Sequence, residues 1–279
     1  MNVQAILAGV LPPLALALLG VSRFGARATG LAAALGALLA YGLLKRWPAL
    51  PHELWRNADG TEWLLWCVLG VALLTLVVRG RRGPAFLVPA LAAACAAGSL
   101  HLMLTKVASG WSGATLALHL GIAAIGVGAV AAAWQRTLRA APQGMFPLVL
   151  ATVVLSLDSG IATLGNSALL GQLCGAVAAA FGATAGARLW RKDAALLPGD
   201  ALFFAFAHGA FLLAGVHVQY LPWTAAVIAG AAPLLALAVP RSWWSSRPRV
   251  AIAATSALVV LPLLVAILML IAEQDQSGY

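Results

Sequence analysis

The sequence predicts an all-α integral membrane protein, a polytopic bundle of about ten transmembrane helices with both termini outside. Of its 279 residues, 62% are hydrophobic and only 9% are charged, whereas soluble domains carry about 25% charged residues. The mean hydropathy is +0.95, and the apolar runs are long enough to cross a bilayer. Such segments must be helical, because lipid offers the backbone no hydrogen-bond partners. No polar stretch is long enough for a soluble domain, so residues 1–279 are expected to form one integral membrane domain.

Ten apolar segments, separated by short polar connections, are the expected spans. We take the first as a retained span, because the basic region of a signal peptide is missing before it. In the longest connection, Pro51 predicts a short interfacial helix that carries Leu54 and Trp55 on one face. The expected spans cover residues 4–21, 28–44, 63–78, 84–104, 114–134, 145–163, 167–187, 201–219, 224–239 and 250–272.

Basic residues fall mainly on alternate connections between these spans. One set comprises Arg23, Arg27, Arg79, Arg81, Arg82, Arg136, Arg139, Arg188, Arg191, Lys192, Arg241, Arg247 and Arg249. The other set has only Lys45, Arg46, Arg56 and Lys106. The positive-inside rule assigns the larger set to the cytoplasm. The N-terminus and the 273–279 tail are therefore expected outside.

Small residues at four-residue spacing predict close helix contacts in the fifth and seventh spans. Such faces fit either a tight bundle or a seam with another subunit, in a homodimer or a larger membrane complex. The two faces consist of Gly171, Gly175, Ala178, Gly182 and Gly186 in the seventh span, and Gly121, Ala124 and Gly128 in the fifth.

A short internal match suggests duplicated halves as an alternative organisation. AAALGA at 32–37 lies in the second span, and AAAFGA at 178–183 lies in the seventh. A five-plus-five inverted repeat, with halves 1–140 and 141–279, is a common transporter architecture. Ala-rich helices also match by chance, so the sequence leaves both explanations open.

Asp158 is the only acidic residue inside an apolar segment, and polar residues surround it in the sequence. A carboxylate at membrane depth is costly, which makes function the default explanation. The alternative is a structural acid that satisfies neighbouring donors. The candidate substrate- or ion-binding residues are Asp158, Ser156, Ser159, Thr163, Asn166 and Gln172.

Two features predict where this site lies in the bundle. Pro12 and Pro13 are expected to interrupt the first span, because proline removes a backbone donor and clashes with the preceding turn. The run from Asp158 to Gly160 is expected to interrupt the sixth span. Paired interruptions in corresponding spans are typical of transporter binding sites. We therefore expect the site near the sixth span, facing the first.

Histidines provide a second candidate site, for a metal or haem. His101 and His119 are expected at similar depth near the outer ends of the fourth and fifth spans, and His217 approaches that level from the eighth. Two imidazoles on facing helices suit haem iron, and three His suit zinc or copper. The alternative is hydrogen-bonded packing. His208 lies on the opposite helix face from His217, since nine residues turn a helix by about half a turn.

Several classes of function lack support in the sequence. Cys67, Cys95 and Cys174 are scattered in separate apolar segments without metal-ligand spacing. No nucleotide-binding or hydrolase motif occurs, and only one carboxylate is embedded, so an enzyme is disfavoured. The net charge of +9 resides in short connections rather than in a basic stripe with aromatics, which argues against nucleic-acid binding.

The sequence therefore favours a small-solute or ion transporter, with the lipid bilayer as its surroundings and no required cofactor. One alternative is a redox subunit that binds haem b or a divalent metal. Another is a non-catalytic subunit of a larger membrane complex. Heavy use of Ala, Gly and Arg suggests a GC-rich bacterial genome, so the cytoplasmic (inner) membrane is the expected location.

Overall fold

Helices account for most of the chain in the computed structural model. The structure describes residues 3–45, 47–57, 59–79, 84–105, 107–141, 144–165, 167–192 and 194–277, without the side chains of 3–6, 8, 55–57, 276 and 277. The α-helices are α1 (Val3–Phe24), α2 (Ala28–Leu44), α3 (Pro51–Asn57), α4 (Gly60–Val78), α5 (Leu87–Leu104), α6 (Gly113–Ala140), α7 (Phe146–Leu164), α8 (Ala168–Ala187), α9 (Ala201–Val218), α10 (Trp223–Ala231), α11 (Arg241–Ser246) and α12 (Pro248–Ser277). The 3₁₀ segments are η1 (Gly25–Arg27), η2 (Val107–Gly110), η3 (Pro198–Asp200) and η4 (Ala232–Ala238).

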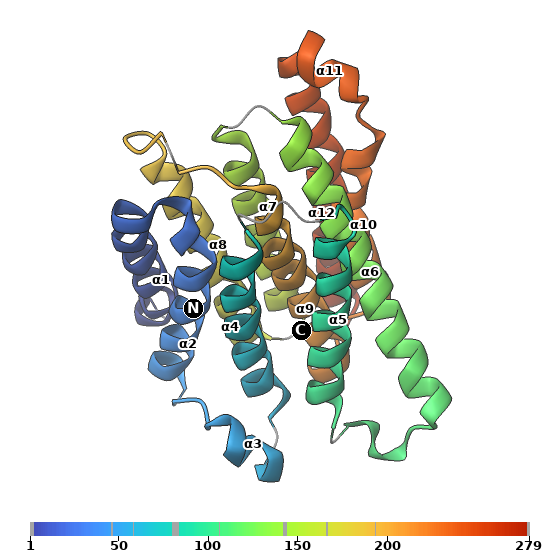
Figure 1. Cartoon of the computed structure of the whole chain (residues 1–279). Helices are drawn as coiled ribbons and strands as arrows, with labels where there is room; N and C mark the ends of the chain where they lie inside the picture. The colour runs from blue at the N-terminus through green and yellow to red at the C-terminus, as the bar shows by residue number, and fades with distance from the viewer. Residues whose placement is uncertain are drawn as a thin grey trace.

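Helix α9 lies at the centre of the bundle and carries much of its core (Figure 1). Its sequence is apolar around the whole circumference, and such a helix is stable where neighbours cover every face. The buried side chains include Phe203, Phe204, Phe206 and Phe211. α9 packs against α4, α5, α6, α7, α8 and α10, so it is the helix best placed to hold buried polar groups.

Eight helical stretches of the described chain are long and apolar enough to cross a membrane. The protein is therefore a multi-pass membrane protein, as the sequence predicted. The first stretch, Gly9–Leu44, turns back at Gly25, whose positive φ of 64° suits glycine. Its two arms, α1 and α2, pack side by side and correspond to the first two expected spans. Ten crossings and the side of the termini remain predictions.

The ninth expected span is shorter than the others. It runs over Trp223–Ala238 and changes from α10 to the 3₁₀ segment η4. Pro233 accompanies the change, because it has no N–H to donate to the carbonyl of Ala229 four residues earlier. A 3₁₀ helix rises about 2.0 Å per residue against 1.5 Å, so the segment extends roughly 27 Å. That length approaches the hydrocarbon thickness of about 30 Å.

The predicted interruptions of two spans are wrong. α1 continues as a helix through Pro12 and Pro13, and α7 continues through Asp158 to Gly160. Gly36 of α2 instead provides the space for Pro13, since a Cβ there would overlap the proline ring. The expected site near the sixth span, facing the first, stays a prediction: α8 packs against both α1 and α7, and residues of all three helices line one groove.

The glycine face of α8 provides close contact within the bundle. Gly171 and Gly175 lie against Ser159 of α7, and Gly182 lies against Thr152. Small residues therefore let the α7 and α8 backbones approach closely, as the tight-bundle alternative predicted. A subunit seam remains untested.

The two ends of the bundle carry different segments. Figure 1 shows α3 at one end and α11 at the other. The predicted short helix at Pro51 is confirmed as α3, whereas α11 was not expected. At the α11 end, Arg191 donates to Ser22 O and Arg79 to Ala195 O. Three basic connections thus share one end, in agreement with the predicted alternation.

The outer surface is rich in apolar side chains. Leu19, Ile125 and Leu268 are 64–75% exposed, on three different helices. In a polytopic membrane protein this surface contacts the lipid bilayer.

Candidate functional site

The most deeply buried polar contact joins Asp158 of α7 to His208 of α9. Asp158 Oδ2 lies 2.7 Å from His208 Nδ1, and both side chains are fully buried. The two residues lie 50 positions apart, and packing of α7 against α9 brings them together. His208 also stacks parallel to Phe204, with 6.1 Å between the ring centroids. Asp158 of α7 and Phe204, on the same helix as His208, therefore hold the imidazole in one orientation.

Each member of the pair keeps one polar atom without a hydrogen-bond partner in the described structure. These atoms are Asp158 Oδ1 and His208 Nε2. An ionised Asp158 can only accept, so with the carboxylate ionised a neutral His208 carries its proton on Nδ1 and donates it to Asp158. Nε2 is then the atom that gains or loses a proton. The backbone carbonyls of Ala229 and Gly230 lie near the ring, and the first of these, Ala229 O, accepts from the backbone N–H of Ala232.

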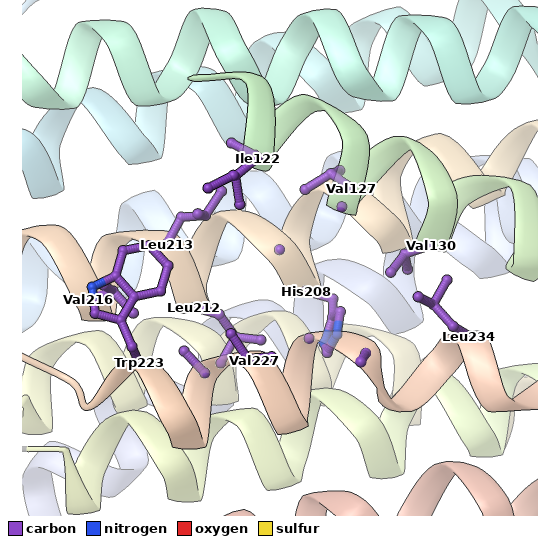
Figure 2. A pocket seen from close by; sticks show the side chains of 16 residues that line it. Ile122, Val127, Val130, His208, Leu212, Leu213, Val216, Trp223, Val227 and Leu234 are labelled. Carbon is purple, nitrogen blue, oxygen red and sulfur yellow. The ribbon is translucent and has the colours of Figure 1, made fainter. Parts of the chain in front are cut away.

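An apolar cavity of about 240 Å³ adjoins this pair. It lies between α6, α9, α10 and η4, and among the described residues that line it His208 alone is ionisable. Figure 2 shows Trp223 towards one end, Val130 and Leu234 towards the other, and His208 between them. The imidazole member of the buried pair thus forms part of the boundary of an otherwise apolar space, with Asp158 behind it.

A second cluster of aromatic and imidazole rings lies near the Trp223 end of the cavity. His119 Nδ1 lies 3.0 Å from His217 Nε2, and His217 Nδ1 lies 2.9 Å from Leu213 O. The carbonyl requires Nδ1–H on His217, so Nε2 accepts from His119. Trp111 and Trp223 lie 4.7 and 5.8 Å from the His119 ring, between centroids. Trp223 therefore belongs both to this cluster and to the cavity lining.

The structure brings two of the three predicted metal-ligand histidines together. His119 and His217 are in contact, whereas His101 is exposed on α5. No group of three His, Cys, Asp or Glu side chains suited to a metal occurs among the described residues. A ligand set that includes His101 remains a prediction.

The predicted hydroxyl stripe lies apart from Asp158. Ser156 and Ser159 line a groove of about 550 Å³ between α1, α7 and α8. Ser159 donates to Gly171 O, and Thr163 donates back to Ser159 O. Gln172 is half-buried beside Gly9 of α1. Asn166 lies outside the described residues. Asp158 faces α9 instead, so the structure divides the predicted set between two locations.

Sequence reasoning did not assign His208 to the candidate site. It placed His208 only on the helix face opposite to His217. One signal was available, because both residues are ionisable groups near the middle of apolar spans. Buried ionisable groups in membranes usually pair with one another. Helix stagger, which the sequence does not give, decides whether two such residues meet.

Comparisons with known proteins do not place the chain in a family. No family model matches the sequence, and no curated protein or solved structure is significantly similar to it.

Proposed function

We propose that the protein is a transporter that exchanges protons for small lipophilic cations at the Asp158–His208 pair. The observation that carries the proposal is the fully buried pair beside an apolar cavity. The proposed setting is the cytoplasmic membrane of a bacterium, with the arginine-rich end inside. This function retains the sequence-based expectation of a transporter and names the proton as the coupling ion.

The charge of the pair explains why two cations would compete for it. With His208 neutral, the carboxylate gives the pair a net charge of −1. A proton on Nε2 makes the pair neutral. An uncompensated charge at this depth costs several kcal/mol, so the −1 state requires a cation nearby. A lipophilic cation in the cavity meets that requirement and excludes the proton.

The cavity wall suits a cation with an apolar body. Its lining residues other than His208 are glycine, alanine, aliphatic residues and Trp223. Apolar walls accommodate methyl groups or an aromatic ring, and an indole face attracts a quaternary ammonium. Strongly hydrated ions would lose their water without gaining oxygen ligands.

The α10–η4 junction offers a route from protonation to movement of the cavity wall. Once protonated, Nε2 can donate a hydrogen bond. The backbone carbonyls of Ala229 and Gly230 lie near the ring and can accept it. The 3₁₀ segment η4 follows α10 just after these carbonyls, and 3₁₀ turns commonly serve as connectors at helix ends. In our proposal, a hydrogen bond from Nε2–H to one of these carbonyls shifts α10, and proton release reverses the shift.

The function is tested by uptake of benzyltrimethylammonium into vesicles that contain the purified protein. This permanently charged aromatic ion serves as the probe, and an acidic interior supplies the proton gradient. We expect gradient-dependent uptake by the wild type and none by Asp158→Asn. Neopentylbenzene, its uncharged counterpart of the same shape, should show no gradient-dependent uptake. Unchanged uptake by Asp158→Asn would exclude the proposed coupling.

A pair of glycines on α6 provides the control for the cavity. Neither Gly126 nor Gly121 has an atom within 4 Å of an added Cβ, but only Gly126 lines the cavity. Gly126→Leu should fill the cavity and abolish uptake, whereas Gly121→Leu should retain it. Equal loss in both variants would show that α6 tolerates no larger side chain, and the cavity would lose its assigned role.

A divalent-metal site at His119 and His217 is the second candidate function. Two imidazole nitrogens on one zinc ion lie about 3.3 Å apart, given Zn–N bonds of about 2.0–2.1 Å. The observed separation is 3.0 Å, so an ion could replace the shared proton. Haem fits less well, because the two rings touch directly. Elemental analysis, visible absorbance and Co²⁺ titration of the wild type against His119→Gln test this candidate.

A further inference from the structure

Four basic residues line one pocket at the α11 end of the bundle, which we predict to be cytoplasmic. The pocket has a volume of about 410 Å³. It lies among the end of α1, η1, the end of α4, and the connection after α8. Its lining residues are Phe24, Gly25, Ala26, Arg27, Arg79, Arg188, Lys192, Ala195 and Leu197. The positive charges therefore converge from three segments, η1, the end of α4 and the connection after α8, instead of being spread along the surface.

Contacts between distant segments hold the pocket together. Arg191 donates to Ser22 O, 2.5 Å away, which ties the end of α1 to the segment after α8. Arg79 Nη2 donates to Ala195 O over 2.7 Å. Gly199 lies directly against the backbone of Arg79, where a Cβ would approach to 2.6 Å. The pocket is thus part of the folded structure and not a chance gap between loops.

Arg79 is the buried cation of this pocket. It is only 7% exposed, and its Nε lies 3.1 Å from Asp200 Oδ2. Nη1 has no hydrogen-bond partner in the described structure. Burial lowers the pKa of the Arg79 guanidinium, Asp200 opposes this, and the charge of Arg27 lowers it further. One guanidinium nitrogen therefore remains available for an acceptor.

The surrounding charges favour an anion. Arg27, Arg188 and Lys192 line the pocket with Arg79, and Asp200 pairs with Arg79. Asp193 lies outside the described residues. Like charges held together repel one another, and an anion with several acceptor oxygens relieves the repulsion while it accepts their hydrogen bonds. A phosphate group has this chemistry.

We propose that this pocket binds the phosphate group of an anionic lipid headgroup. Basic pockets between transmembrane helices on the cytoplasmic side are suited to anionic headgroups. Phe24 lines the pocket and is 71% exposed, which places an apolar ring beside the charged site for an acyl chain. A lipid here would join the ends of α1, α4 and α8.

The test compares three probes on the detergent-purified full chain: dihexanoyl phosphatidylglycerol, dihexanoyl phosphatidylcholine and inorganic phosphate. We expect the wild type to bind phosphatidylglycerol and not phosphatidylcholine. Arg27→Gln and Lys192→Gln should each weaken binding about fivefold, the usual effect of one basic residue near an anionic surface. The matched controls Arg247→Gln and Arg249→Gln lie at the same end, outside the pocket, and should bind as the wild type does.

The phosphate arm identifies the source of the ligand. If inorganic phosphate binds as tightly as phosphatidylglycerol, and the pocket variants weaken its binding to the same extent, the site binds a soluble phosphate. Stronger binding of phosphatidylglycerol assigns it to lipid. The proposal is overturned if neither probe binds, or if the control variants lose as much affinity as the pocket variants.

Discussion

Asp158 and His208 differ from several threonines of the bundle in how they are satisfied. The hydroxyls of Thr75, Thr137 and Thr184 donate to carbonyls four residues earlier in their own helices. The acid and the imidazole have no such local solution, and each relies on the other across two helices. Loss of one member leaves a buried group unpaired, whereas loss of both leaves only a packing change.

This dependence predicts strong non-additivity between the two positions. His208→Leu should destabilise the protein by about 3–5 kcal/mol, because it leaves the carboxylate buried without a partner. Asp158→Leu combined with His208→Leu should recover most of that loss. Thermal unfolding in detergent measures both, with His101→Leu as the exposed-histidine control. Equal instability of the single and double variants would contradict the pairing.

The sequence identified Asp158 as the residue to explain, because a lone acid in an apolar segment is conspicuous. It grouped Asp158 with Ser156, Ser159 and Thr163, since helical periodicity places them close together. Periodicity does not tell which neighbour each face meets. In the structure the hydroxyls face α8 and the groove near α1, and the acid faces α9.

At the scale of helices, glycine positions decide how closely α7 and α8 approach. A Cβ on Gly171 would overlap Thr163 Oγ1 and press on Ser159 O, whereas a Cβ on Gly186 would meet no atom within 4 Å. Both glycines lie on the same helix face by spacing. Only the structure separates a contact glycine from one with open space beside it.

Alanine at these two glycines should therefore have opposite effects. Gly171→Ala should destabilise the protein by about 1–3 kcal/mol, the usual cost of overpacking. Gly186→Ala should be neutral or stabilising by up to about 1 kcal/mol, because alanine favours the helix. Unfolding temperatures of the two variants, measured side by side, check the prediction. A stable Gly171→Ala variant would show that α7 and α8 can separate without cost.

Helix existence was predictable from the sequence, and helix continuity was not. The expected span 28–44 coincides with α2 (Ala28–Leu44), because the length of an apolar run is enough to predict a membrane-spanning helix. The expected breaks at Pro12 and at Asp158 depend on local backbone strain. Pro13 is accommodated by Gly36 on the neighbouring helix, and a tertiary contact of this kind has no signature within the span itself.

At the scale of the whole molecule, the bundle has two chemically different ends. One holds α11 and the pocket of Arg27, Arg79, Arg188 and Lys192. The other holds α3 and the cluster of Trp111, His119, His217 and Trp223. This polarity agrees with the charge bias that the sequence shows, and it places the cavity beside His208 between the two ends.

The expected orientation puts the basic end in the cytoplasm. This orientation can be measured with single cysteines in a variant that lacks the three native cysteines. One replaces Ser245 in α11, and the other replaces Asp275 near the end of α12. A membrane-impermeant maleimide added to intact cells should label position 275 and leave position 245 unlabelled until the cells are opened. The reverse pattern would invert the topology, and with it the proposed side of the lipid site.

The central claim is that one buried site holds either a proton or a lipophilic cation. ¹⁵N NMR of histidine-labelled protein in bilayers, with the His208 signals assigned through His208→Gln, observes it directly. Between about pH 9 and pH 5, where histidines normally titrate, Nε2 of His208 should gain a proton. Benzyltrimethylammonium should then remove that proton in the wild type and have no effect on Gly126→Leu. An Nε2 signal that changes neither with pH nor with the added cation would contradict the account.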